Sequence, residues 1–224
     1  MKSAVYLICG LVLIFNSSSM SQDFSILANK VIEKDFNGMD ELFKTGMDIN
    51  MQDKSSGVTV LMIASAYPHY KDVLEFLLNR NADVNIKSNE GKTALIWAVS
   101  ASDENVKLLL SKGADANAKT NDGMTPFIQS VLSILSNKVT TEVCDTLLKA
   151  GAKINTAITG RNAPGWTALH FAAFEGNLDL VNYLIRHGAN VNSVSDDGSS
   201  VLSLAKSGKY NDVVASLRKS GARD

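Results

Sequence analysis

The sequence contains few of the residues that usually mark a disulfide scaffold, a metal site or a catalytic centre. Its 224 residues include two cysteines, three histidines and three prolines. No two histidines have metal-ligand spacing, neither cysteine pairs with a histidine, and no glycine-rich phosphate-binding motif occurs. We therefore expect no metal, no cofactor and no enzymatic activity.

An excess of charge of either sign is also lacking. The formal net charge is −1, so the bulk composition does not attract nucleic acid or an anionic membrane surface. Apolar residues make up 45% of the chain and charged residues 20%, as in ordinary folded domains. The composition predicts a folded domain without a nucleic-acid partner.

The first 22 residues differ from the rest of the chain. Lys2 precedes an apolar run at residues 4–15, and small polar residues follow that run. This order predicts a secretory signal peptide at residues 1–21, cleaved after Ser21 or, alternatively, after Ser19. As a helix the run would rise about 18 Å, well short of a hydrocarbon core of roughly 30 Å. An uncleaved membrane anchor is therefore the less favoured alternative.

Cleavage of this segment would also remove Cys9. Cys144 would then be the only cysteine, which excludes an internal disulfide. No Asn-x-Ser/Thr site follows residue 22, which argues against a glycosylated secretory route. Together these features predict a bacterial-type exported protein, either periplasmic or secreted, with no membrane contact after cleavage.

Two short patterns recur in a fixed order along the remaining chain. The first is Gly-x-Thr-x-Leu-x-x-Ala, whose copies begin at Gly57, Gly91 and Gly165, with weaker copies from Gly123 and Gly198. The second is Leu-Leu-x-x-Gly-Ala-Asp-x-Asn, whose copies end at Asn50, Asn85, Asn117, Asn155 and Asn192. Successive asparagines lie 35, 32, 38 and 37 residues apart, which indicates repeating units with small insertions.

At these residues the chain resembles the ankyrin repeat family, over about residues 25 to 222. The resemblance implies an all-α solenoid of stacked helix-turn-helix pairs joined by β-turn or hairpin-like loops. One such pair cannot bury its apolar face alone, so stacking supplies the core. The implied domain is 22–224, with repeats at about 25–56, 57–90, 91–122, 123–164, 165–197 and 198–222.

The local chemistry of each unit agrees with a pair of helices. A threonine that can cap the helix with its hydroxyl precedes four of the first helices, at Thr59, Thr93, Thr125 and Thr167. Residues suited to left-handed backbone follow the second helices, at Asn81, Gly113, Gly151, Gly188 and Gly221. Cys144 aligns with apolar positions of other second helices, so we expect a buried thiol rather than a nucleophile.

Two insertions interrupt the repeat. One adds about five residues between the helices of the fourth unit, at residues 133–141. The other lengthens the loop before the fifth unit, at residues 156–164. Insertions in solenoids often map to the binding face, but surface loops also accept them at little cost. Both interpretations stay open.

The resemblance also implies candidate binding residues in a concave groove. In this family the residue between Gly and Thr, and the two residues after the Ala-Ala pair, face that groove. These slots hold Trp166, Phe174 and Glu175 in the fifth unit and Tyr67 in the second. An exposed Trp166 would be a strong contact residue, but the loop at 156–164 could equally cover it.

Loop tips supply the other candidates, since ankyrin proteins usually make polar contacts there. These residues are Asn89, Glu90, Lys92, Asn121, Asp122, Met124, Asp196 and Asp197. Trp97 and Phe171 share a slot that we expect to pack between repeats. The histidine with which the family usually braces neighbouring loops survives only as His170.

These features predict a monomeric, exported protein-binding module. Its partner would be another protein of the envelope or the secreted fraction, and the chain would act as a scaffold or adaptor. The alternatives are an inhibitor or immunity protein of an exported toxic enzyme, and a membrane-tethered form. An enzyme would need a convergent set of polar groups, and the sequence shows none.

Overall fold

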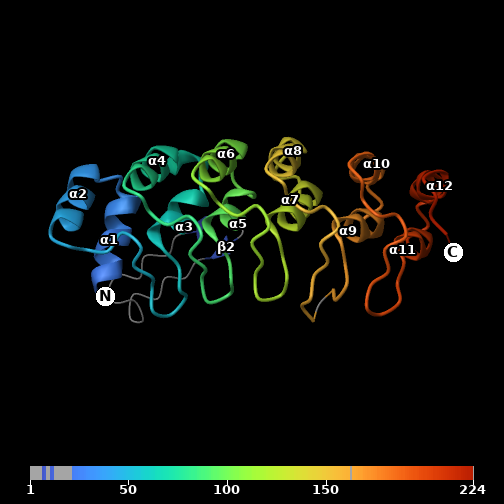
Figure 1. The fold of residues 1–224 in the computed structure, drawn as a ribbon, viewed down its shortest axis with the longest axis horizontal. Helices are drawn as coiled ribbons and strands as arrows, with labels where there is room; N and C mark the ends of the chain where they lie inside the picture. The colour runs from blue at the N-terminus through green and yellow to red at the C-terminus, as the bar shows by residue number, and fades with distance from the viewer. Residues whose placement is uncertain (1–6, 9–10, 13–21, 162, 224) are drawn as a thin grey trace.

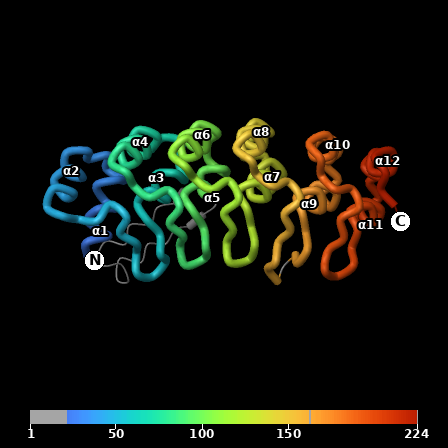
Figure 2. Tube along the Cα trace, viewed as in Figure 1, coloured from blue at the N-terminus to red at the C-terminus, as the bar shows by residue number. Residues whose placement is uncertain are grey.

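The computed structural model describes residues 7–8, 11–12, 22–161 and 163–223. Twelve α-helices follow one another in pairs along these residues and form one linear stack (Figures 1 and 2). Hairpin-like loops project from one side of the stack and connect successive pairs. The predicted all-α solenoid of stacked helix pairs is confirmed.

The first helices of the pairs form one layer and the second helices form another. The first helices are α1 (Gln22–Ile32), α3 (Val60–Ser65), α5 (Ala94–Ala98), α7 (Pro126–Leu135), α9 (Ala168–Phe174) and α11 (Val201–Ser207). The second helices are α2 (Phe36–Lys44), α4 (Lys71–Asn79), α6 (Asp103–Ser111), α8 (Glu142–Lys149), α10 (Leu178–Arg186) and α12 (Asn211–Lys219). A 3₁₀ turn, η1 (Pro68–Tyr70), leads from α3 into α4.

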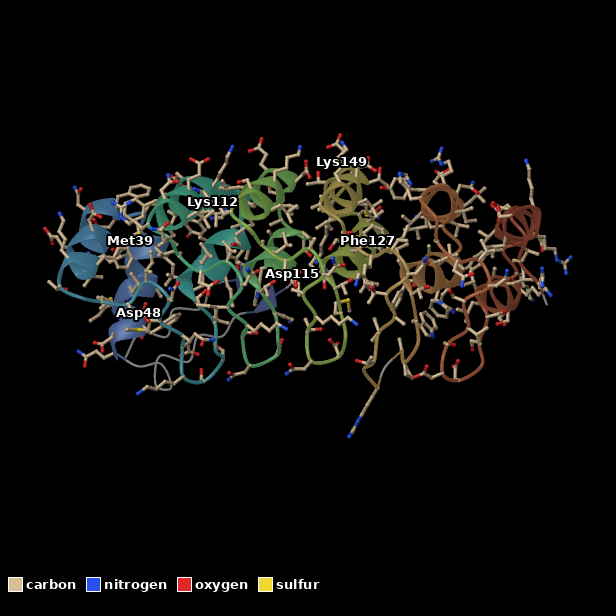
Figure 3. The ribbon with its side chains drawn as sticks, viewed as in Figure 1. Met39, Asp48, Lys112, Asp115, Phe127 and Lys149 are labelled. Carbon is tan, nitrogen blue, oxygen red and sulfur yellow. The ribbon has the colours of Figure 1, made fainter. Side chains whose placement is uncertain are left out.

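The core runs the length of the stack between the two layers. Each first helix contacts the next. Ala64, Ala98 and Ala172 are fully buried on these helices, and their small side chains allow the helices to pack closely. Larger residues fill the space behind them. Phe127 of α7 is fully buried, whereas Lys112 and Lys149 lie on the solvent side of the second-helix layer (Figure 3).

The repeating asparagine forms a hydrogen-bonded ladder between units. The side-chain oxygen of Asn117 accepts from the backbone N–H of Lys153 at 2.9 Å, and its amide donates to the Gly151 carbonyl at 3.0 Å. Asn85 makes the equivalent pair of bonds one repeat earlier, to Asp115 and Gly113. These bonds satisfy backbone groups at the loops and fix the distance between neighbouring repeats.

The helix-end predictions hold at most positions. The hydroxyls of Thr59 and Thr125 accept hydrogen bonds from the N–H groups of Met62 and Ile128. The hydroxyl of Thr167 instead pairs with Nδ1 of His170 at 2.9 Å, and the buried hydroxyl of Thr93 makes no hydrogen bond to the described residues. Asn81 takes the left-handed conformation at φ 61°, as predicted.

The inter-helix insertion differs from a simple loop. Residues 133–135 continue α7, and the connection to α8 begins only at Ser136. Ile134 and Leu135 pack against the core, so apolar burial extends the helix here. The insertion also accompanies a cleft of about 860 Å³, whose lining includes Ile134, Thr141 and residues of α10 and α12.

Little of the expected signal peptide belongs to the described residues. Leu7–Ile8 (β1) and Leu11–Val12 (β2) form a short antiparallel pair, and the other residues of 1–21 lie outside the described part. In the described ranges, no helix is both long and apolar enough to cross a membrane.

Candidate protein-binding groove

The hairpin loops are joined to one another by backbone hydrogen bonds. The N–H of Asn89 donates to Ser56 O, that of Asn121 to Glu90 O, and that of Thr159 to Asp122 O. The side-chain amide of Asn121 adds a bond to the carbonyl of Asn89 at 2.8 Å. The loops therefore form a continuous wall beside the first helices, and we call the surface between this wall and those helices the groove.

Several predicted loop-tip residues take part in this bracing. Asn89 donates to the carbonyl of Ser55, and Asn121 donates to Asn89. The carboxylate of Asp197 accepts from the hydroxyl of Ser195 at 2.6 Å and from the N–H of Ser199 at 3.0 Å. Hydrogen bonding to Ser195 holds the pKa of Asp197 below its ordinary value. These side chains have a structural role, and their contact with a partner stays a prediction.

The other tip residues differ in exposure. Glu90, Asp122 and Asp196 are exposed, whereas Met124 is half-buried. Lys92 is half-buried because it reaches along the groove, where it pairs with Glu90 at 2.7 Å.

The long loop before the fifth unit is itself a hairpin. Ile158 and Trp166 pair through their backbones, and the N–H groups of Thr159 and Gly160 donate to the carbonyl of Asp122. The insertion at 156–164 therefore extends the wall of loops and docks on the previous hairpin.

Trp166 lies at the base of this hairpin and packs against α9. Its ring centroid lies 5.0 Å from that of Phe171 and 5.4 Å from that of Phe174, both in edge-to-face arrangements. Trp166 and Phe171 are half-buried, but Phe174 is 52% exposed. We call these three residues the aromatic ridge. The structure thus gives Trp166 an intermediate position between the two predicted alternatives, and the exposed Glu175 follows Phe174.

A second feature lies further along the groove. A pocket of about 460 Å³, which we call the central pocket, opens over the second, third and fourth repeats. Its lining residues are Ala66, Tyr67, Pro68, His69, Lys92, Ile96, Trp97, Ser100, Ala101, Gln129 and Lys138. Two predicted residues, Tyr67 and Lys92, therefore belong to the same site although 25 positions separate them in the chain.

Polar side chains beneath the central pocket hold its walls in place. Asn105 of α6 is fully buried and donates to the carbonyls of Ser65 and Tyr67, at 3.2 and 3.4 Å. On the other side, the hydroxyls of Ser100 and Ser133 lie 2.7 Å apart, and the amide of Gln129 donates to Ser100 at 3.2 Å. The pocket therefore has a hydrogen-bonded frame that spans three repeats.

Sequence reasoning missed most of the residues that line this pocket, among them Trp97, Gln129 and Lys138. Trp97 packs against the core, in agreement with the expected packing between repeats, but its half-buried side chain also forms one wall of the pocket. Gln129 occupies the equivalent slot one unit later, and Lys138 comes from the inter-helix insertion. The insertion was the one signal that could have pointed to Lys138, because loops added to a solenoid often join its binding face.

The cysteine and histidine side chains that could act in catalysis or metal binding do not form a common site in the described residues. Cys144 is fully buried beside the hydroxyl of Ser130, and burial raises the pKa of its thiol to about 11. This confirms the expected buried thiol. His170 is also buried, its Nδ1 accepts from the N–H of Thr167 at 3.1 Å, and burial lowers its pKa. Across the described ranges, no group of three or more His, Cys, Asp or Glu side chains could hold a metal ion.

A linear stack of helix pairs with a wall of loops along one side defines a repeat protein that presents an extended surface. The family model for ankyrin repeats in three copies matches residues 26–120, 87–158 and 131–223. The chain therefore belongs to the ankyrin repeat family. Ankyrin repeats bind other proteins, so the chain is a protein–protein interaction module.

Relatives share parts of this sequence. The Notch-regulated ankyrin repeat-containing protein of Xenopus tropicalis is 32% identical over 89 residues, which cover 40% of this chain and 78% of the relative. Protein glp-1 of Caenorhabditis elegans is 28% identical over 168 residues, 72% of this chain but 13% of the relative. Neurogenic locus notch homolog protein 1 of Mus musculus is 31% identical over 146 residues, 65% of this chain and 5% of the relative.

The similarity to glp-1 and to the mouse notch homologue is confined to a small part of each protein. The activities of those whole proteins therefore do not transfer to this chain. All three relatives come from animals, so they lend no support to the expectation of a bacterial protein.

Proposed function

We propose that the chain holds a partner protein in its groove and acts as a scaffold or adaptor rather than as an enzyme. The aromatic ridge carries this proposal. Phe174 is a large apolar side chain that is 52% exposed, and it packs on the ring of Trp166, which in turn packs on Phe171. Exposed, rigid aromatic side chains of this kind are the usual energetic centres of protein interfaces.

The arrangement of the groove supports the same function. The ridge and the central pocket both combine first-helix residues with a residue of the preceding hairpin, Trp166 in the ridge and Lys92 in the pocket. Hydrogen bonds between the loops hold this surface in one conformation, so a partner would bind with little loss of chain entropy.

Substitution at the ridge tests the proposal. We expect Phe174→Asp to reduce partner recovery at least tenfold when tagged wild-type and variant proteins are compared by quantitative affinity capture from the producing cells. The thermal unfolding midpoint should change little, because the side chain is exposed. Ile26→Asp, which alters another exposed apolar residue on α1, is the matched control. Equal recovery with wild type and Phe174→Asp would reject the ridge as the binding surface.

Export is a second part of the proposal, and it rests on the residue pattern of positions 2–22. A basic residue, an apolar run and small polar residues stand in the order of a cleaved signal. The partner would then be an envelope or secreted protein. Mass spectrometry of the mature protein should find an N-terminus near Gln22, whereas an intact Met1 in the fractionated protein would contradict export by cleavage.

The module is also proposed to be monomeric. Both ends of the stack carry charged or polar exposed side chains, for example Asp23 on α1 and Asp212 and Lys219 on α12. Such capping surfaces disfavour end-to-end stacking of copies. Light scattering should give a mass close to one chain, and a mass of two chains would refute this point.

A further inference from the structure

The central pocket carries a positive rim. Lys92 reaches it from a hairpin and Lys138 from the connection between α7 and α8, while His69 lies beside them. No aspartate or glutamate is among its described lining residues. Because the whole chain is nearly neutral, the positive charge of these lining residues is a property of the site and not of the composition.

The two lysines differ in their ion pairs. The ammonium group of Lys92 lies 5.6 Å from the centre of the Trp97 ring and 2.7 Å from the carboxylate of Glu90. Glu90 is itself exposed, so this ion pair is weak and can exchange for another carboxylate. Lys138 is exposed and forms no ion pair with any of the described residues.

The walls between the lysines are mainly apolar. Tyr67 and Trp97 are half-buried and Ile96 is buried, so aromatic and aliphatic faces lie next to the charged rim. A volume of about 460 Å³ accommodates a few side chains but not a folded element. Such a combination suits an extended segment that carries an acidic residue beside an apolar one.

Lys138 comes from the segment that departs from the regular repeat. It lies at residues 133–141, where the fourth repeat carries about five more residues between its helices than the other repeats do. The hydrogen-bonded frame of Asn105, Ser100 and Gln129 fixes the walls that the insertion completes.

We propose that the central pocket binds an acidic segment of the partner protein, with a carboxylate beside Lys92 and Lys138 and an apolar side chain against Trp97. This proposal deepens the proposed function and rests on it. The aromatic ridge would supply apolar contact area, and the central pocket would select the sequence of the segment.

Selection from a phage-displayed library of random dodecapeptides tests the proposal on the full chain. We expect peptides enriched on the wild-type protein to contain an excess of aspartate and glutamate next to an apolar residue. Their affinity should fall at least tenfold for the Lys92→Gln, Lys138→Gln double variant, because two charge-assisted contacts are lost. Their affinity should also fall with rising salt, because the lysines are partly exposed to solvent.

Lys149→Gln is the matched control, since it removes one exposed lysine from α8, outside the pocket (Figure 3). It should leave peptide affinity unchanged. Circular dichroism of each variant should match that of the wild type, because neither lysine of the pocket belongs to the core.

The outcomes separate the two proposals. Peptides without an acidic excess, or with equal affinity for the double variant, would overturn the acidic-segment proposal. If those peptides still lost affinity for the Phe174→Asp variant, the proposal that a partner binds in the groove would stand, and only the acidic-segment proposal would be rejected. If no peptide were enriched over the bare support, both proposals would fall.

Discussion

The two leucines of the repeated Leu-Leu pattern differ in burial on the second helices, so they should contribute differently to stability. Leu109 of α6 is fully buried, while its neighbour Leu110 is half-buried. Both lie in the Leu-Leu pattern that ends each unit, so the sequence presents them as equals. Their different burial follows from the helical period, which turns only one of them fully into the core.

Leu109→Ala is expected to reduce the free energy of unfolding by roughly 2–5 kcal/mol, because it removes buried methyl groups and leaves a cavity. Urea denaturation followed by circular dichroism would measure the change. Leu110→Ala should cost clearly less, since part of that side chain already contacts water. Equal losses for the two variants would contradict the burial difference.

The buried thiol of Cys144 gives a prediction about pH. Burial raises its pKa from 9.0 to about 11, so the folded state keeps its proton where the unfolded state begins to lose it. The contribution of Cys144 to stability is therefore constant below about pH 9 and falls as the pH rises from 9 to about 11. The Cys144→Ser variant should therefore lose less of its free energy of unfolding than the wild type between pH 9 and about pH 11, as measured by urea denaturation.

Reagent accessibility checks the same residue. At pH 8, iodoacetamide should not modify Cys144 in the folded protein but should modify it in urea, as read from the mass of its peptide. Rapid labelling of the folded protein would show that the thiol is not sealed in the core.

Among the elements, the hairpins depend on glycines for two different reasons. Gly91 and Gly113 both have left-handed backbone, with φ of 77° and 87°. A Cβ on Gly91 would lie 2.8 Å from the backbone nitrogen of Asn121 in the next hairpin. A Cβ on Gly113 would meet nothing within 4 Å. The first glycine therefore permits close packing of hairpins as well as an unusual φ.

Alanine substitution separates these two effects. Gly113→Ala should reduce the free energy of unfolding by about 1–2 kcal/mol, because only the left-handed conformation is penalised. Gly91→Ala should cost more, since the hairpins must also move apart. Thermal denaturation of the two variants gives the comparison, and a Gly91→Ala variant no less stable than Gly113→Ala would contradict the close contact.

At the scale of the whole molecule, the layer of second helices has a wider gap between α8 and α10 than between α6 and α8 (Figure 1). The second helices α8 and α10 are bridged by the hydroxyl of Tyr183, which donates to Asp145 at 2.5 Å. Burial and this hydrogen bond raise the pKa of Tyr183 above its ordinary value. In a linear array each repeat contacts only its neighbours, so a weak interface lowers the cooperativity between the two sides.

Tyr183→Phe should weaken this interface by about 1 kcal/mol through loss of one hydrogen bond. Hydrogen exchange measured by mass spectrometry should then show faster exchange in α8 and α10 than in wild type, with α3 and α4 unchanged. An equal change in all helices would mean that the stack opens as one cooperative unit.

The amino-acid sequence by itself determined the repeat architecture. Periodic leucines, capping threonines and terminal glycines act within one unit or between adjacent units, so their spacing is enough to predict the helix pairs. Only the tertiary structure brought together the residues of the central pocket. Tyr67, Trp97 and Lys138 are separate in the chain and meet only when three repeats stack, because a groove is a property of the stack and not of a single repeat.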